Sequence, residues 1–380
     1  MIRSSLRVFK RSQSSSTFGI WSNFTNRSPR LQLQDESIKK DLFNELPKDQ
    51  KPASILTYDE KQQYHSPIDI DETFSMAYKI LEKEAESKYK YINRIKLAID
   101  SKQVSNEELT ELKDQLDKIL IDAEIENPEV LYNFEFLNSE DLDKSQPVYR
   151  ALLKQKWENY DLLVTMQRLE QLHVIPDTLP TLNPKADVKV KFTHNIDTEF
   201  QNWITPGTLL PAFAVSKPPT IHIQEFERKD GNENLYTVLL VNPDTPDLET
   251  NSFKTTLHYG LKNVSLTNND NTIDVSRIMK NGPKITFHEY LPLTPEKNAG
   301  VQRACLWVFR QDSNIDKINE IKNDENFNIR KFVDEYKITP IGAHVWRQKF
   351  DRSVPNVRNE YGLGKGRVFE KIRGTEPLNL

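Results

Sequence analysis

Tyr236-Thr-Val-Leu-Leu-Val-Asn-Pro-Asp-Thr-Pro-Asp247, an apolar run that ends in two prolines, is the most informative part of the chain. An unbroken run of branched apolar residues predicts a buried strand. We expect this strand to break at Asn242-Pro243-Asp244-Thr245-Pro246, because proline fixes φ, lacks an N–H donor and forces the preceding residue into an extended conformation. The prolines therefore predict a stiff rim that holds polar side chains at the mouth of a β-fold.

Two further motifs follow the prolines along the chain. His258-Tyr259-Gly260-Leu261 begins eleven residues after Asp247 and precedes another apolar stretch. Gly300-Val301-Gln302-Arg303-Ala304 then leads into Cys305–Arg310, an apolar run typical of a strand. Cys305 is the only cysteine, which excludes an intramolecular disulfide, and we expect it to be a small buried side chain.

In order and approximate spacing these motifs resemble the phosphatidylethanolamine-binding protein family. The family pattern is a strand, Asp-Pro-Asp-x-Pro, then His-Trp, then Gly-x-His-Arg-Tyr before another strand. The segments 332–338 and 339–342 resemble the closing helix and final strand of that family. The resemblance covers about residues 176–351 and implies an α+β fold with an antiparallel β-rich domain.

The resemblance also implies an anion pocket, but its residues differ here. The matching positions are Asn242, Asp244, His258, Gln302 and Arg303. Asn242 stands where the family has aspartate, Gln302 where it has histidine, and Ala304 where it has tyrosine. An imidazole can be cationic near neutral pH and a glutamine amide cannot, so phosphate binding should be weakened. We expect a degenerate pocket, in which His258 and Asp244 are ordinary structural polar residues.

The N-terminal residues 1–34 contain six basic residues, frequent serine and no acidic residue. Ile2, Leu6 and Phe9 fall on one helical face. This composition predicts a mitochondrial transit peptide, and the alternative is a disordered basic tail. The sequence has no run of 18 apolar residues that would predict a membrane span.

Residues 35–175 predict a helical extension. One helical pattern runs from Ala77 to Ile99, and a capping box at Ser105–Glu108 begins a second pattern, which ends at Pro128. We expect the two to pack as a helical hairpin, followed by a third helix from Pro147 to Leu172.

The charge of the chain is unevenly distributed, although its net value is only −4. Residues 107–144 carry thirteen acidic residues and three lysines, a net charge of −10. Such a segment should be repelled by a bare phosphate backbone. It is either a solvated face or a contact with a basic protein.

The C-terminal residues 352–380 form a predicted basic tail in which glycines and the rings of Tyr361 and Phe369 alternate with cations. Flexible backbone, cations and planar rings suit a segment laid along RNA, and the alternative is a merely disordered tail. The predicted RNA contacts are Arg352, Arg358, Lys365, Arg367, Lys371 and Arg373.

Other chemistry is sparse. The seven histidines show no zinc-ligand spacing, and the sequence contains no nucleophile elbow and no dinucleotide-binding loop. His222 alternates with Ile221 and Ile223 as in a strand, and we expect a structural role for it. We therefore predict no catalytic residues, no metal site and no cofactor.

A second resemblance joins these parts. The segments 163–184 and 364–375 are similar to the phosphatidylethanolamine-binding-like proteins of the fungal mitochondrial large ribosomal subunit. That resemblance implies a non-catalytic structural protein of the mitochondrial matrix at the central protuberance, in contact with ribosomal RNA and neighbouring proteins. Two alternatives remain: a mitochondrial lipid- or anion-binding protein that uses His258, Asp244 and Arg303, and an inhibitor that docks an enzyme through the same rim.

Overall fold

A computed structural model describes residues 70–100, 106–137, 141–228, 234–316, 318, 321 and 326–370. The predicted transit peptide, Ser105 of the predicted capping box, Lys371 and Arg373 lie outside these residues. By its internal contacts the chain divides into two compact units between Leu142 and Asp143, except that Pro147–Tyr149 pack with the first. Each unit is described by itself.

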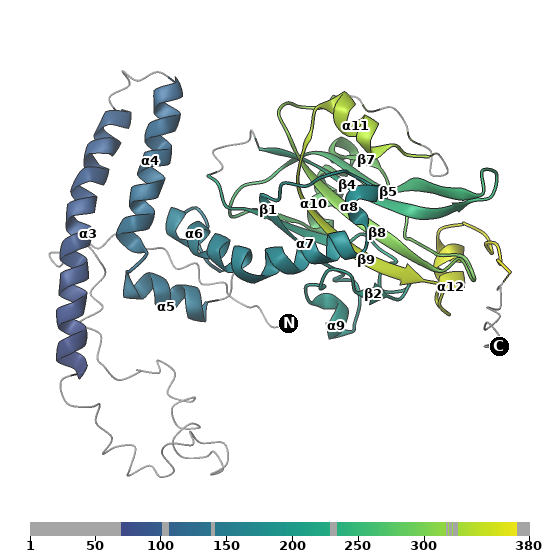
Figure 1. The fold of residues 1–380 in the computed structure, drawn as a ribbon, viewed down its shortest axis with the longest axis horizontal. Coiled ribbons are helices and arrows are strands. Elements are labelled where there is room, and N and C mark those ends of the chain that lie inside the picture. Colours follow the sequence, from purple (N-terminus) through teal and green to yellow (C-terminus); the bar gives the residue numbers. More distant parts are fainter. Residues whose placement is uncertain are drawn as a thin grey trace, which may run out of the picture. The chain divides into compact units, whose positions relative to one another are not determined.

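The first unit is helical. It contains α3 (Ile70–Asp100), α4 (Asn106–Glu124) and α5 (Pro128–Phe136) (Figure 1). The predicted hairpin is confirmed, because Ile92 and Ile95 of α3 are buried together with Leu116 and Ala123 of α4.

One detail of the predicted hairpin was wrong. Ala77 is exposed, and the neighbouring Tyr78 is buried in its place, which is a phase error of one residue in the helical pattern. The second helix ends before Pro128 as expected, and Pro128 also begins the short helix α5, because proline fits the first turn of a helix, where no N–H partner is needed.

The predicted third helix is confirmed, with a local widening. It consists of α6 (Pro147–Lys156), the π-helical stretch η4 (Trp157–Asp161) and α7 (Leu162–Gln171), and Pro147 lies in its first turn. A π-turn inserts one extra residue per turn and so changes which side chains face the core. Trp157, at the start of this stretch, is buried.

The second unit contains two β-sheets. The three-stranded sheet has the order β1-β3-β6, and the six-stranded sheet has the order β2-β9-β8-β4-β5-β7. All strand pairs are antiparallel except the short β2–β9 pair. The strands are β1 (Ala186–Lys191), β2 (Leu209–Leu210), β3 (Thr220–Glu225), β4 (Leu235–Asp247), β5 (Ser252–Ser265), β6 (Thr272–Ile273), β7 (Thr286–His288), β8 (Val301–Gln311) and β9 (Thr339–Lys349).

The helices of this unit are α8 (Val174–Asp177), α9 (Thr198–Gln201), α10 (Val275–Ile285), α11 (Ile329–Tyr336) and α12 (Val354–Glu360), in addition to most of the α6–α7 segment. The predicted closing helix and final strand are confirmed as α11 and β9. The fold is therefore α+β, with an antiparallel β-rich domain after a helical region.

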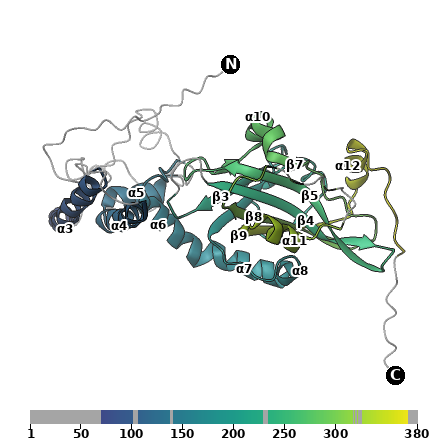
Figure 2. The same cartoon turned by 90° about the horizontal axis from the view of Figure 1, so that it is seen from above.

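Two apolar layers enclose the six-stranded sheet. One layer lies between the two sheets and includes Val190, Ile221, Leu240 and Trp346. The other layer lies on the opposite face, where α7, α8 and α11 cover the strands (Figure 2). Gly342 of β9 allows the two sheets to approach closely, because a Cβ atom there would lie 2.6 Å from Val188 Cγ2.

The expected break at Asn242-Pro243 was wrong. β4 continues to Asp247 and still pairs with β5 beyond the prolines, with Thr245 opposite Lys254. The register shifts between Asn242 and Thr245, so Pro243 lies where the ladder is already irregular, and Pro246 lies opposite Phe253 where the register resumes. The rim is a bulge within a continuous strand, and the bulge directs its polar side chains.

Candidate functional site

The five predicted pocket residues come together at the bulge of β4. Asn242 and Asp244 lie on β4, His258 lies on β5, and Gln302 and Arg303 lie at the start of β8. Adjacent residues of a strand point to opposite faces, so Gln302 and Arg303 enter different networks. Asn242, His258 and Gln302 are buried, and each of the five is hydrogen-bonded within the protein.

The imidazole of His258 lies between two oxygen atoms that determine its tautomer. Nδ1 lies 2.9 Å from the carbonyl oxygen of Leu291, and Nε2 lies 3.1 Å from the hydroxyl of Thr256. A carbonyl oxygen only accepts, so Nδ1 carries the proton and the neutral ring accepts at Nε2 from Thr256. Thr256 Oγ1 lies 2.8 Å from Thr245 Oγ1, and Thr245 must donate, because the Thr256 proton is already engaged.

The amide of Asn242 ends this row of hydroxyls. Its Nδ2 donates to Thr245 Oγ1 and to Gln302 Oε1, both at 3.1 Å. Its Oδ1 accepts from the backbone N–H of Asp244 at 3.0 Å. Both amide protons and the amide oxygen are engaged, and an aspartate could make neither donor contact. The difference from the family pattern thus supplies the donor that this network needs.

His258 is held in its neutral form. Burial lowers the pKa of the imidazole to about 4, and the Leu291 carbonyl opposes this shift only in part. If Nε2 also carried a proton, it would donate to Thr256, and Thr256 would then donate to Thr245. The hydroxyl proton of Thr245 would point at the amide protons of Asn242, so two donors would face each other. His258 therefore supplies no cation near neutral pH.

Arg303 is bound by acceptors from its own chain. Asp244 receives hydrogen bonds at 2.8 Å from both the backbone N–H and Nε of Arg303, and at 2.5 Å from Nη2. Nη1 donates to the carbonyl oxygen of Leu172 at 2.7 Å and to Asp177 at 2.8 Å. Burial lowers the pKa of the guanidinium, but the hydrogen bonds to Asp244 and Asp177 outweigh it and raise the pKa. Acceptors in residues 172–177, between α7 and β1, thus already bind the guanidinium that would otherwise be available to an anionic ligand.

Several buried polar groups beside this site were missed by the sequence reasoning. Gln348 pairs in register with Gln302, and neither of its amide atoms has a hydrogen-bond partner among the described residues. His344 Nδ1 and Trp346 Nε1, four and two residues before Gln348 on β9, also lack a hydrogen-bond partner among the described residues, as does Tyr259 Oη. The signal was present as polar residues at every second position of a predicted strand, where apolar residues are usual.

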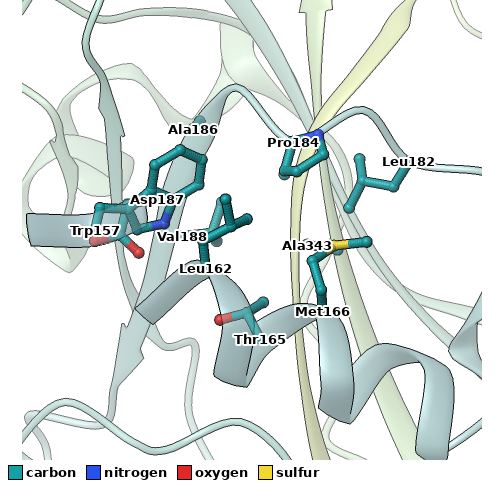
Figure 3. Close-up of a pocket in the computed structure, with 11 residues that line it drawn as sticks. Trp157, Leu162, Thr165, Met166, Leu182, Pro184, Ala186, Asp187, Val188 and Ala343 are labelled. Atoms are coloured by element: carbon teal, nitrogen blue, oxygen red, sulfur yellow. The ribbon is translucent and has the colours of Figure 1, made fainter. Parts of the chain in front are cut away.

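A small pocket lies elsewhere in the second unit, where α7 crosses β1 and β9 (Figure 3). Trp157, Met166, Pro184 and Val188 line it, and its volume of about 10 Å³ corresponds to roughly one water molecule. Its carboxylate is Asp187, whose pKa burial raises against the opposing charge of Lys189. The pocket contains none of the predicted site residues.

The predicted C-terminal tail is folded against the β-rich unit as far as Phe369. Val354 and Val357 of α12 are buried with Ala212, and the hydroxyl of Tyr361 donates to the carbonyl oxygen of Ser216 at 2.6 Å. Phe369 continues this attachment, because its N–H donates to the carbonyl oxygen of Lys297 at 3.0 Å. The Tyr361 ring that we expected to stack on RNA is thus anchored in the protein.

The guanidinium of Arg358 makes its hydrogen bonds within the protein, which disfavours its predicted RNA contact. Nε donates to the carbonyl oxygen of Gly364 and Nη2 to that of Leu363, both at 3.0 Å, and Nη1 reaches Thr294. Gly362, Gly364 and Gly366 all have positive φ, so the chain curls around this side chain. Arg352, Lys365 and Arg367 are exposed.

The described residues contain no group of three or more histidine, cysteine and carboxylate side chains that could hold a metal ion. The helices of the described residues include none that combines the length and the apolar character needed to cross a bilayer. Cys305 is buried as expected, and burial raises the pKa of its thiol. His222 lies in β3 as expected, where burial lowers the pKa of its ring to about 3.

Comparison with known families identifies the β-rich unit. Residues 200–345, which contain the bulge of β4 and the strands β5, β8 and most of β9, match the family model "Phosphatidylethanolamine-binding protein". The chain contains a phosphatidylethanolamine-binding protein domain. The match begins later and ends slightly earlier than the segment 176–351 on which we saw the resemblance.

One curated relative covers more of the chain than this domain. The chain is 29% identical over 263 residues to "Large ribosomal subunit protein mL38" of Schizosaccharomyces pombe, an alignment that covers 69% of this chain and 79% of that protein.

Among solved structures, the carboxypeptidase Y inhibitor in complex with its proteinase is 14% identical, with a TM-score of 0.38, and covers 49% of this chain and 95% of its own. The phosphatidylethanolamine-binding protein of Plasmodium vivax is 12% identical, with a TM-score of 0.37, and covers 49% and 98%.

Proposed function

We propose that this protein is a non-catalytic structural component of the mitochondrial large ribosomal subunit, in contact with ribosomal RNA and neighbouring proteins near the central protuberance. The observation that carries the proposal is the likeness to a large-subunit ribosomal protein over 69% of the chain. That alignment is 263 residues long and the family match spans only residues 200–345, so the likeness extends well beyond the domain.

The geometry of the domain supports a role without a head-group ligand. His258 is neutral, and the guanidinium of Arg303 already binds Asp244, Asp177 and a backbone carbonyl. A phosphate would have to displace charge-assisted hydrogen bonds that are already made. We therefore favour a degenerate pocket over the alternative of a mitochondrial lipid- or anion-binding protein.

Contact with RNA is assigned to the exposed cations of the C-terminal segment. Lys365 and Arg367 project from the loop that encloses Arg358, and Arg352 precedes α12. We add Lys371 and Arg373 from their position in the sequence, and we omit Arg358 because its guanidinium is hydrogen-bonded within the protein and its side chain is only 14% exposed. Cations that neutralise phosphates release condensed counterions, which makes such binding sensitive to salt.

Location in the mitochondrial matrix is part of the same proposal and rests on residues 1–34. A fluorescent reporter fused to these residues should enter mitochondria, because basic, serine-rich segments without acidic residues direct import. A reporter that stays in the cytosol would exclude this role for the segment.

Sedimentation tests the proposal as a whole. A lysate of mitochondria is separated on a sucrose gradient and the protein is detected by blotting. We expect it to peak with the large ribosomal subunit and to remain near the top of the gradient when the subunits are dissociated into free RNA and protein. A peak that stays with soluble matrix proteins in the intact lysate would overturn the proposal.

A further inference from the structure

The outward face of α5 is apolar although it lies in the most acidic part of the chain. Leu131, Tyr132, Phe136 and Leu137 are each between 45% and 70% exposed. The rings of Tyr132 and Phe136 lie one helical turn apart with centroids separated by 4.7 Å, so they form one aromatic surface. We call these four residues the α5 face.

The opposite side of α5 fixes the orientation of this face. Val130 is buried, and Asn133 Nδ2 donates to the hydroxyl of Tyr149 at 3.4 Å. The helix begins with a capping contact, in which Asn127 Oδ1 accepts from the N–H of Glu129 at 3.0 Å. The α5 face is therefore presented on an anchored helix.

The sequence around the α5 face is rich in acidic residues. Residues 119–143 contain eight acidic residues and neither lysine nor arginine. Glu126, just before α5, and Glu135, directly before Phe136, are exposed, whereas the next cations along the chain, Lys144 and Arg150, are buried. This charge repels a phosphate backbone and attracts cationic side chains.

We propose that the α5 face binds a basic segment of another protein. Arginine and lysine side chains would lie over the Tyr132–Phe136 rings and pair with the neighbouring carboxylates, while apolar side chains of the same segment would cover Leu131 and Leu137. The partner is thus a protein segment rich in arginine and lysine with interspersed apolar residues. The inference rests on the proposed function, since it seeks this partner within the large subunit.

Site-specific photo-cross-linking in the full-length chain tests the inference. Phe136 is replaced by the photoreactive amino acid p-benzoylphenylalanine, and large subunits are irradiated after purification. The matched control places the same group at Leu97 of α3, which is as exposed as Phe136, at 70%, but follows the basic residues Arg94 and Lys96. We expect an adduct from position 136 that resists ribonuclease, with a captured peptide, identified by mass spectrometry, that carries more lysine and arginine than aspartate and glutamate.

Charge variants show whether complementarity holds the partner. Glu126→Gln together with Glu135→Gln should lower the yield of the adduct by roughly threefold or more, because two charge pairs at the edge of an interface are lost. The same change at the exposed Glu111 and Asp114 of α4, as Glu111→Gln and Asp114→Asn, should leave the yield unchanged. Equal losses from both pairs of substitutions would contradict a partner held at α5.

Other cross-linking results would overturn the inference. These are an adduct to RNA, an adduct to a second copy of this chain, a captured peptide that is not basic, or no adduct above the level of position 97. If the protein still sediments with the large subunit in those cases, the proposed function stands and only the α5 partner is lost. If the protein does not sediment with the subunit, the proposed function fails independently of α5.

Discussion

The bulge of β4 and the α5 face differ in whether their side chains already have partners within the protein. At the bulge, each polar group of Asn242 is hydrogen-bonded within the chain, and Arg303 reaches two carboxylates and a carbonyl. On α5, large apolar side chains lie in solvent beside carboxylates. The five motif residues at the bulge are paired within the chain, although the buried amide of Gln348 opposite Gln302 is not, whereas the α5 face, which carries no motif, is exposed.

This difference indicates where binding free energy is available. A polar group that is already paired must lose its partner before it can bind another, so it contributes little net free energy. Exposed apolar surface contributes about 25 cal/mol for each Å² that a partner covers. Under the proposed function, the chain would therefore bind its partners through surfaces outside the ligand-motif region, such as the α5 face.

The largest expected effect concerns the ion pairs of Arg303. Arg303→Met should lower the free energy of unfolding by about 3 kcal/mol, because it leaves Asp244, whose side chain is only 19% exposed, without its counter-charge. Urea denaturation followed by tryptophan fluorescence measures this, since Trp307 and Trp346 lie in the core.

Asp177→Asn is the matched control for that variant. Its side chain is 45% exposed, so the substitution should cost less than about 1 kcal/mol. If Arg303→Met were as mild as Asp177→Asn, the closed network at the bulge would not contribute to stability and the contrast with α5 would be lost.

The second effect is a loss of stability in acid that involves His258. Its folded pKa of about 4 lies below the unfolded value of about 6.5, so between these values the unfolded chain binds the extra proton. Stability is therefore full above pH 6.5 and falls as the pH drops towards 4, by about 2 kcal/mol from this residue between pH 7 and pH 5. Denaturation at several pH values measures the slope.

His258→Asn tests the assignment of that slope. The variant lacks the titrating group, so it should lose about 2 kcal/mol less than the wild type over the same pH interval. His222 and His344, with pKa values of about 3 and 4, act in the same direction in both proteins. Parallel slopes would show that burial does not hold His258 neutral.

A smaller effect distinguishes the two kinds of cation in the C-terminal segment. Arg358→Ala should weaken the attachment of α12 by about 1–2 kcal/mol, because its hydrogen bonds to carbonyl oxygens are lost, and hydrogen exchange of α12 amides measures it. Lys365→Ala with Arg367→Ala should leave that exchange unchanged and make the protein leave the large subunit at lower salt. If the double variant remains bound at every salt concentration, protein contacts and not these cations retain the chain.

The order of motifs along the sequence predicted more of the domain than composition did. The apolar runs around Leu239 and Trp307 became β4 and β8, and the pocket positions converged as the resemblance implied. The spacing of Ile92, Ile95 and Leu116 predicted the helical hairpin. Local patterns sufficed here because strand and helix periodicity are properties of neighbouring residues.

Features that depend on distant contacts were not predictable in this way. The sequence around Arg358 looks like an exposed basic tail, and only Thr294 and the folded-back glycine loop show that the guanidinium is enclosed. Asp177 pairs with Arg303 across more than a hundred residues. The continuation of β4 beyond Pro243 likewise depends on its pairing with β5, which local propensity does not contain.

The most direct test of the account is calorimetric titration of the purified full-length protein with phosphorylethanolamine at neutral pH. The account predicts no binding tighter than about 1 mM, equivalent to about −4 kcal/mol, because His258 is neutral and Arg303 is occupied by its own chain. A dissociation constant in the micromolar range, about −8 kcal/mol, would contradict the closed bulge and favour a lipid- or anion-binding protein.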